Sequence, residues 1–484
     1  MNFKAVSIYV GKALTISALF MFFSIIVSII DGLDAGFTPL LISLIITLVV
    51  GVFPMIFLKG TPALSVRDGY LVIFLAWLLS FLFGMLPYLL YGGEFTVVNA
   101  WFESVSGYTT TGSTILTDIE SLPRSLLFWR SSTHFIGGLG VIILLLLIIP
   151  DSSAFKYRLS SLEVSAISKE GYRFKSGKMV NVMLSVYVGL TVVETLLLCL
   201  AGMSFFDALN HSFSTIATGG FSVRNTSIMY YDSLWIDIII MVFMVLASMH
   251  LGFTYTVFAR RSLRPLTKEI SRYYLLMILL LTLGVFINLV SEGTYETVGR
   301  AFRNSAFQVI SFISTTGFGN ADNAVWPIFA NTLLLFAAFH CGCSGSTTGG
   351  VKADRMLLAF KTVANELRHR LSPSSVSMIR LDGVTVKNDT ISAVLLYIVA
   401  YVVVLFLSFL GVLLCGVDVS EAFSATLSSL GNTGPAIDSL GTMGSFSGQP
   451  SVAKIIYSMD MFFGRVEIFP ILAVFSVKLS LNRR

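Results

Sequence analysis

The chain has 484 residues, of which 55% are hydrophobic and only 12% are charged, about half the charged share of an ordinary soluble domain. This composition excludes a water-soluble globular protein and indicates a helical membrane protein. The net charge of +5 is too small for a nucleic-acid-binding protein, and four cysteines are too few for a disulfide framework in a chain of this length.

Ten apolar stretches follow one another along the chain, each close to the roughly 20 residues that a transmembrane helix needs. They cover residues 5–30, 36–58, 69–91, 124–149, 179–201, 231–258, 273–291, 327–350, 390–416 and 451–477. The first is longer than a signal-peptide core and lacks a cleavage site, so we expect it to be retained. We therefore predict an all-α integral membrane protein with ten transmembrane spans and both termini on one side.

The basic residues of the connections indicate which side that is. The two terminal segments and four connections on one side hold 24 of the 32 Lys and Arg, whereas the opposite connections are mostly acidic. The basic segments are 1–4, 59–68, 151–178, 259–272, 352–387 and 478–484. Because Lys and Arg collect on the cytoplasmic side, we predict that both termini are cytoplasmic. Attraction to anionic lipid is the alternative explanation of the same bias.

Four of the acidic-side connections share one design, a short amphipathic stretch followed by a Thr-Gly step. They are NAWFESVSGYTTTGS (99–113), FDALNHSFSTIATGG (206–220), NSAFQVISFISTTGF (304–318) and EAFSATLSSLGNTGP (421–435), and they align without a gap. The alignment pairs Gly112, Gly219, Gly317 and Gly434 at intervals of 107, 98 and 117 residues. Such repetition implies repeated structural units. Residues 69–149, 179–258, 273–370 and 390–481 are therefore predicted to be four helix, re-entrant pore loop, helix repeats in a pseudo-fourfold arrangement, and residues 1–58 an additional two-helix hairpin.

The four short stretches predict an ion pathway. Non-helical backbone at membrane depth is tolerated only where protein buries it or where it lines a watery cavity, so the four loops are expected to converge on one axis. The negative C-terminal ends of the short helices would then face a cation, and glycine carbonyls could replace its hydration shell. These loops carry no ring of carboxylates, which argues against calcium or magnesium. For any single loop, the alternative is a small-residue contact between helices.

Two features lie where a gate would be useful. The span that starts near Trp326 is interrupted at residues 341–350 by a glycine-rich segment that is unfavourable for a helix, and we expect this segment to obstruct the pore. Its glycines are Gly342, Gly345, Gly349 and Gly350. Arg465, in the last span, is the second feature, because a charge at mid-span needs a cavity or a partner. The alternatives are a tight glycine contact for the segment and an ion pair with Asp460 or Glu467 for Arg465.

Other readings of these motifs are weaker. Residues 345–350 outline a phosphate-binding loop but lack its lysine, since Val351 follows. His340, Cys341 and Cys343 could bind a metal, but no further pair completes a tetrahedral site. Arg130 and His134, four residues apart, are expected to hold helices together rather than to bind ions, and His211 and His250 are expected to be structural.

The four loops resemble those of the superfamily of potassium transporters, most closely its bacterial Trk-type membrane subunits (TrkH), with the KtrB type next. The resemblance implies potassium uptake across the bacterial inner membrane, with potassium at Gly112, Gly219, Gly317 and Gly434. The residues just before them would complete the filter: Thr110, Thr111, Ala217, Thr218, Thr315, Thr316, Asn432 and Thr433. It also implies gating by the glycine-rich loop and Arg465, a homodimer, and a cytosolic nucleotide-binding regulatory ring of the TrkA type, with no cofactor in this chain.

Two competing functions belong to other classes. A secondary symporter that couples potassium to sodium or protons is the main alternative, although such transporters usually have inverted repeats and buried acids. A membrane enzyme is disfavoured, because the spans contain no paired acids, nucleophile elbow or metal motif.

Overall fold

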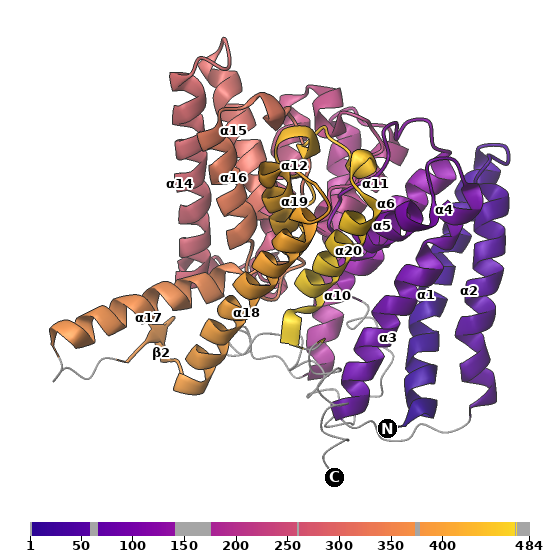
Figure 1. Ribbon diagram of the computed structural model, residues 1–484, viewed down its shortest axis with the longest axis horizontal. Helices are drawn as coiled ribbons and strands as arrows, with labels where there is room; N and C mark the ends of the chain where they lie inside the picture. Colours follow the sequence, from indigo (N-terminus) through magenta and orange to yellow (C-terminus); the bar gives the residue numbers. More distant parts are fainter. Residues whose placement is uncertain are drawn as a thin grey trace.

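The computed structural model describes residues 2–58, 66–140, 176–258, 261–372, 378–469 and 471. This part of the chain is almost entirely helical, apart from loops and a two-stranded antiparallel hairpin (Figure 1). The α-helices are α1 (Phe3–Ile30), α2 (Phe37–Phe57), α3 (Val66–Gly84), α4 (Leu86–Tyr91), α5 (Val97–Tyr108), α6 (Arg124–Leu139), α10 (Ser176–Leu200), α11 (Phe205–Ile216), α12 (Leu234–Ser248), α13 (Leu251–Phe258), α14 (Glu269–Ser291), α15 (Val298–Ile313), α16 (Ile328–His340), α17 (Ala353–Leu371), α18 (Asn388–Leu413), α19 (Val419–Gly431) and α20 (Ser451–Val466). Short 3-10 turns are η1 (Ser227–Tyr231), η2 (Arg264–Thr267), η3 (Asn323–Val325), η4 (Asp438–Leu440) and η5 (Phe446–Gly448), and the strands are β1 (Arg380–Leu381) and β2 (Val384–Thr385).

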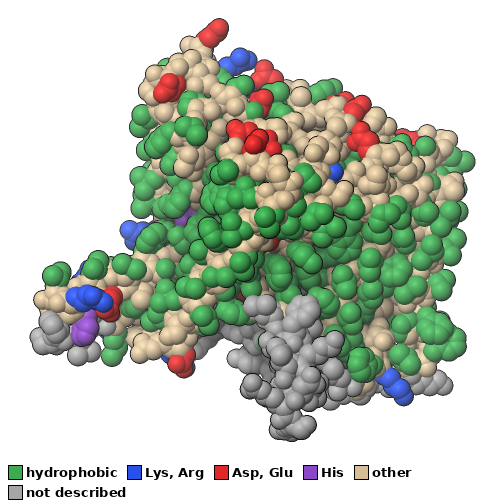
Figure 2. Space-filling model, in the orientation of Figure 1, with side chains coloured by type: hydrophobic (Ala, Val, Ile, Leu, Met, Phe, Trp, Pro, Cys, Tyr) green, Lys and Arg blue, Asp and Glu red, His purple; other side chains and the backbone are tan. Residues whose placement is uncertain are grey.

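Six helices within the described residues are long and apolar enough to cross a bilayer, and a bent pair, α12 with α13, makes a seventh. The six are α1, α2, the stretch Asp68–Tyr91, the stretch Val182–Leu200, α14 and α18. Each coincides within a few residues with a stretch that the sequence predicts. Figure 2 shows a broad hydrophobic band in the middle of the molecule, with Asp and Glu gathered above it.

The outer surface of the long helices is apolar enough to face lipid. On α18, exposed residues recur every three or four positions and form one stripe, with each side chain between 42% and 59% exposed: Leu396, Val399, Val403, Phe406 and Leu410. A stripe of this size in contact with water would be unfavourable, whereas hydrocarbon accepts it. The chain is therefore a membrane protein with several apolar helices.

The inner helices α6, α12, α16 and α20 are short because each is interrupted. The sequence predicts a break only in 327–350 and continuous helices at 124–149, 231–258 and 451–477, and the structure differs. Helices α12 and α13 meet at 115°, and Gly140 and Glu467 end α6 and α20 with φ angles of 74° and 63°. Positive φ angles cannot continue a right-handed helix. Residues 141–149 and 472–477 of the predicted spans lie outside the described residues.

The short helices α5, α11, α15 and α19 are connected through the inner helices. Each packs against the inner helix that follows it in the chain and against the inner helix of the preceding unit. The series closes on itself, because α5 packs against both α6 and α20. Sequence-distant segments therefore surround a common centre.

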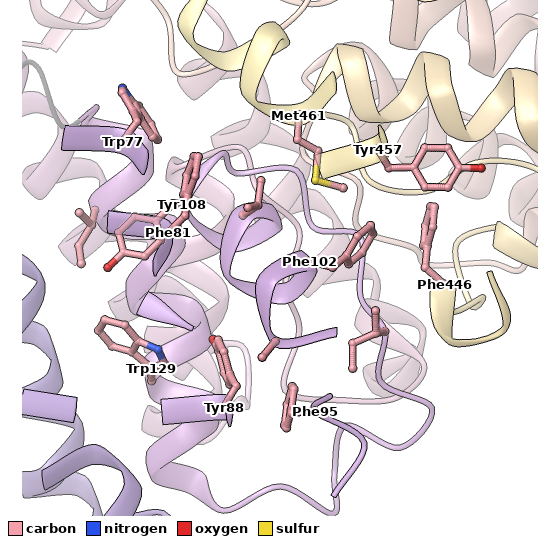
Figure 3. Packing of buried hydrophobic residues seen from close by; sticks show 14 of the residues in the cluster. Trp77, Phe81, Tyr88, Phe95, Phe102, Tyr108, Trp129, Phe446, Tyr457 and Met461 are labelled. Carbon is pink, nitrogen blue, oxygen red and sulfur yellow. The ribbon is translucent and has the colours of Figure 1, made fainter. Parts of the chain in front are cut away.

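The hairpin of α1 and α2 packs on this assembly through α1, which contacts α3 and α6, and through α2, which contacts α4. Gly11 and Gly51 let the two helices cross closely, since a Cβ on Gly11 would overlap the Gly51 carbonyl oxygen. An aromatic cluster around α5 lies next to the hairpin and joins α3, α4, α6 and α20 (Figure 3). Within it, the Tyr108 hydroxyl at the end of α5 donates to Ser17 of α1 at 2.9 Å.

Candidate functional site

The four short helices end in the same turn. One or two positions after each helix, a residue other than glycine takes the left-handed conformation, with φ between 53° and 55°: Thr110, Thr218, Thr315 and Asn432. The N–H of the next residue then bonds to a serine carbonyl five positions earlier, at 2.8–2.9 Å, in the pairs Thr111–Ser106, Gly219–Ser214, Thr316–Ser311 and Thr433–Ser428. This is the 6→1 bond of a Schellman motif, and it turns the chain out of each helix in the same direction.

A glycine follows each of these turns, and the four glycines form a closed ring. They are Gly112, Gly220, Gly317 and Gly434, with φ angles of 86°, 79°, 76° and 100°. A Cβ on each would overlap a backbone carbonyl of the next loop: Gly219 for Gly112, Thr316 for Gly220, Thr433 for Gly317, and Thr111 for Gly434. Both the positive φ and the close approach of backbone require glycine at these positions.

The second loop differs from the sequence alignment by one residue. The gap-free alignment placed Gly219 beside Gly112, Gly317 and Gly434, but in the structure Gly220 takes that position and Gly219 takes the place of Thr111. Ala217 then corresponds to the residue before the left-handed position. The adjacent Gly219 and Gly220 made the alignment ambiguous. The serine six positions before each ring glycine, Ser214 in this loop, is the signal that would have fixed it.

A cavity of about 90 Å³ touches all four ring glycines. Its other lining residues come mainly from the chain that leaves each glycine, including Ser113, Thr114, Ser222 and Pro435. The cavity therefore lies on the side of the ring away from the short helices' C-terminal turns. Glycine, serine and threonine make up more than half of the lining residues, which also include Arg130 and Arg224.

Arg130 and His134 hold the first two loops together, as the sequence predicts. Both are buried on α6. Arg130 forms an ion pair with Glu103 of α5 at 2.7 Å and donates to the Ser222 carbonyl at 3.1 Å. The His134 ring stacks on Phe221 with 4.1 Å between centroids. Breaking a buried ion pair of this kind typically costs about 3–5 kcal/mol.

The segment 341–350 lies against the helix ends beneath the ring. The Thr347 hydroxyl donates to the carbonyls of Ile216 in α11 and Ala247 in α12, at 3.2 and 3.3 Å. A Cβ on Gly349 would overlap the Asn432 side chain, and a Cβ on Gly350 would overlap the Cys341 sulfur. Gly342 approaches the Ser248 carbonyl, and the Gly345 carbonyl accepts from Leu251 at 3.1 Å. The segment, which belongs to the third unit, therefore contacts the second and fourth units.

Arg465 binds to this segment from α20. Its guanidinium donates to the Thr347 carbonyl and, at 2.6 and 3.1 Å, to the carbonyls of Gly137 and Gly138 near the end of α6. The two acids that the sequence offered as partners bind elsewhere. Glu467 pairs with Lys352 and Arg355 at 3.2 and 2.7 Å. Asp460 accepts from Ser408 at 2.6 Å.

Three further histidines, His211, His340 and His250, have structural partners. The two ring nitrogens of His211 contact the Asp207 carbonyl and the Ser222 hydroxyl at 2.7 and 3.0 Å. His340 contacts the Tyr273 hydroxyl at 3.0 Å and the Cys341 carbonyl at 2.9 Å. His250 accepts from the Gly252 amide at 2.9 Å at the bend between α12 and α13.

An ion-pair network lies at the rim of the second loop. Arg224 donates to Asp207 at 2.8 Å, and the Tyr231 hydroxyl donates to the same carboxyl oxygen at 2.8 Å. Burial raises the pKa of Asp207, but the hydrogen bonds from Arg224 and Tyr231 outweigh it and hold this pKa below its usual value of 3.8. The Asp207 carboxyl group is therefore ionised at neutral pH and forms an ion pair with Arg224.

Comparison with known proteins assigns the chain to a family. The family model TrkH, described as a cation transport protein, matches residues 40–483. The chain belongs to the TrkH family. Its relatives are named as transporters, and the chain is not an enzyme.

Members of the TrkH family resemble the chain over its whole length. The Trk system potassium uptake proteins TrkH of Salmonella typhimurium and Halomonas elongata are 33% and 34% identical, and each alignment covers 98% of this chain and 99% of the relative. The crystal structure of the potassium transporter TrkH from Vibrio parahaemolyticus matches with a TM-score of 0.88 at 32% identity, over 98% of both chains.

Three residues of this TrkH-family site were missed by sequence reasoning. Gly220 was passed over because of the alignment. Glu103 was not recognised because an acid inside an amphipathic stretch has no partner visible in the sequence. Glu467 was considered only as a partner of Arg465, whereas its partners come from the start of α17, more than 100 residues away.

Proposed function

We propose that the protein takes up potassium through the ring formed by Gly112, Gly220, Gly317 and Gly434. The observation that carries the proposal is the closed order of contacts, in which each glycine lies against the carbonyl of the next loop and the fourth returns to the first. Four carbonyls around one axis can replace the water around a dehydrated monovalent cation. The names of the relatives, Trk system potassium uptake proteins, support potassium as that cation.

The residues before each ring glycine complete the proposed filter. They are Thr110 and Thr111, Thr218 and Gly219, Thr315 and Thr316, and Asn432 and Thr433, with Ala217 just before them in the second loop. The short helices α5, α11, α15 and α19 enter as pore helices of four re-entrant loops, and their negative C-terminal ends favour a cation beneath the ring. The four units and the hairpin of α1 and α2 together cross the membrane ten times.

The gate in this proposal is the segment 341–350 together with Arg465. The segment lies against helix ends of the second and fourth units, where it obstructs the path below the ring. The Arg465 guanidinium adds a fixed positive charge that raises the energy of a passing cation. Gly342, Gly345, Gly349 and Gly350 let the segment rearrange, since glycine adopts conformations that other residues do not.

Topology and partners complete the proposal. Both termini face the cytoplasm of a bacterial inner membrane, because they lie on the same side as the basic connections, and Lys and Arg collect on the cytoplasmic side. The protein forms a homodimer and binds a cytosolic nucleotide-binding ring of the TrkA type through the basic region 352–387, which includes α17. This helix extends away from the membrane-spanning helices in Figure 1.

Coupled symport of potassium with sodium or protons is the second candidate, and two buried acids favour it. Glu194 in α10 and Asp460 in α20 are 0% and 1% exposed. Intramembrane acids of this kind often carry coupling ions in secondary transporters. Channel-like conduction remains the leading proposal, because the ring itself contains no acid.

Flux into liposomes that contain the purified protein tests both candidates. Potassium or rubidium uptake driven by membrane potential alone, without sodium or a pH gradient, is expected for channel-like conduction, and uptake that requires either gradient would establish symport. Gly112→Ser adds a side chain where φ is 86° and space is absent. It should weaken discrimination of potassium over sodium, and an unchanged permeability ratio would contradict the ring.

A further inference from the structure

The junction between the first and second loops contains an ion pair in which both side chains are buried. The carboxylate of Glu103 in α5 and the guanidinium of Arg130 in α6 are 0% and 1% exposed and lie 2.7 Å apart. Both charges are therefore removed from water at a position that borders the cavity over the ring. Charges in such a setting are retained only when their partners are fixed.

Glu103 holds the first loop just beyond Gly112. Its two oxygens accept from the Thr114 hydroxyl at 3.0 and 3.1 Å, and one of them also accepts from the Ile115 amide at 3.1 Å. These two residues follow Gly112 by two and three positions. The carboxylate therefore fixes the direction in which the first loop leaves the ring.

Arg130 holds the second loop at the corresponding place. It donates to the Ser222 carbonyl at 3.1 Å, and its guanidinium lies 3.9 Å from the centre of the Phe221 ring. These residues directly follow Gly220. A third donor nitrogen reaches the Thr114 hydroxyl at 3.3 Å, so one guanidinium binds residues of both loops at once.

At the junction of the second and third loops, Asp237 of α12 accepts from Asn320 at 2.9 Å and from Arg303 at 2.7 Å. The remaining contacts near the ring are neutral hydrogen bonds. Gly319 accepts from two amides of the second loop, Ile228 and Met229, at 3.0 and 3.1 Å. Thr442 of the fourth loop donates to the Ala321 carbonyl at 2.7 Å. Ser113 of the first loop donates to the Gly434 carbonyl at 2.9 Å. Hydrogen bonds that involve a charged group are about twice as strong as neutral ones.

We infer that Glu103 and Arg130 are positioning residues that set the separation of Gly112 from Gly220 and thereby the rejection of sodium. The inference rests on the proposed function, since it concerns how the proposed filter keeps its width. Sodium is smaller than potassium, so carbonyls that can move inward stabilise it better. A rigid bridge that prevents such movement favours potassium.

The test compares potassium-to-sodium permeability ratios of the purified full-length protein in liposomes. Glu103→Gln removes one charge, and Arg130→Lys keeps both charges but replaces the planar fork that reaches both loops with a single ammonium group. Both variants should lower the ratio by about tenfold, the factor expected when one charge-assisted hydrogen bond is lost from the site. The permeability ratio does not depend on how much of the protein folds. If Glu103→Gln fails to fold, Arg130→Lys still provides the test, because it leaves no buried charge unpaired.

Glu421→Gln is the matched control. It makes the same substitution in the short helix α19, where the carboxylate accepts from Ser439 and Gln449 of its own connection at 2.5 and 3.1 Å. It should keep the wild-type ratio. If Arg130→Lys also keeps that ratio, the pair only balances charge and the inference is wrong. A wild-type protein that shows no preference for potassium would instead overturn the proposed function, and this result is visible before any variant is made.

Discussion

The Arg465 guanidinium donates a hydrogen bond to the Thr347 carbonyl and so joins α20 to the glycine-rich segment 341–350. The same guanidinium reaches the Gly137 and Gly138 carbonyls of α6. One side chain therefore connects the fourth unit, the first unit and the segment that enters from the third. These carbonyl oxygens solvate the positive charge of Arg465.

Replacing Arg465 with glutamine should raise potassium flux. A unit charge about 10 Å from the path changes the barrier by about 1–2 kcal/mol at an effective dielectric constant near 20, which corresponds to about a tenfold change in rate. Rubidium uptake into liposomes measures the effect. Arg368→Gln, which removes an exposed charge from α17, should leave the rate unchanged. Equal or lower flux in the Arg465 variant would exclude an electrostatic barrier.

Loosening the segment itself should also raise flux. Thr347→Val preserves the shape of the side chain but removes the hydroxyl that donates to Ile216 and Ala247, so the segment should leave its position more often. Ser346→Ala is the control, because that hydroxyl bonds to Cys343 and Thr348 within the segment. Deletion of residues 345–350 should have a larger effect than Thr347→Val. A folded deletion variant with normal flux would show that the segment does not obstruct the pore.

Gly219 and Gly220 should respond differently to alanine. In Gly220→Ala the new methyl group would overlap the Thr316 backbone, and the φ of 79° disfavours any side chain. In Gly219→Ala the new methyl group would lie 2.5–2.7 Å from the His134 ring. A second substitution at His134 can relieve this overlap, because it involves a side chain and not the backbone. Flux should be lost in both single variants. His134→Ala should restore it in part for Gly219→Ala and not for Gly220→Ala, and the reverse result would reject the ring assignment.

The hairpin of α1 and α2 should be anchored mainly by Asp34. Its carboxylate accepts from the Ser125 amide and hydroxyl at 3.1 and 2.7 Å and from Ser28 at 2.6 Å. Asp34→Ala leaves these donors unpaired and should lower stability by about 2–3 kcal/mol. The exposed ion pair of Asp31 with Arg124 contributes at most about 1 kcal/mol to stability. Asp31→Asn should therefore lower stability less than Asp34→Ala does. Thermal unfolding in detergent measures both.

The Asp207 carboxylate should stabilise the protein in a pH-dependent way. Its pKa in the folded protein is lowered below 3.8 by Arg224 and Tyr231, so its contribution is present above the unfolded pKa and is lost as the pH falls through the lowered value. Asp207→Asn should reduce the melting temperature at pH 7. The difference from wild type should shrink below pH 3.8, and a constant difference across this range would argue against a contribution from the ionised carboxylate.

The long apolar helices could be predicted from composition alone. Residues 5–30 and 390–416 were expected as spans and form α1 and α18, because nearly every side chain in them favours hydrocarbon over water. The breaks in α12 and α20 could not be predicted in this way. Neither Met249 nor Glu467 disrupts a helix by its own propensity, and the chain bends there because packing and ion pairs from distant segments stabilise the bend.

The amino-acid sequence determined which long helices are apolar enough to cross a membrane, the fourfold recurrence of a Thr-Gly step and the positions of the glycine-rich segment and Arg465, since all of these follow from local hydrophobicity and local conformational preference. Only the tertiary structure decided that Gly220 rather than Gly219 belongs to the ring, that Glu103 pairs with Arg130 and that Arg465 binds the Thr347 carbonyl. These relations depend on which segments pack together in the folded chain, from 27 residues apart for Glu103 and Arg130 to 118 for Arg465 and Thr347, and such contacts leave no trace in the local sequence pattern.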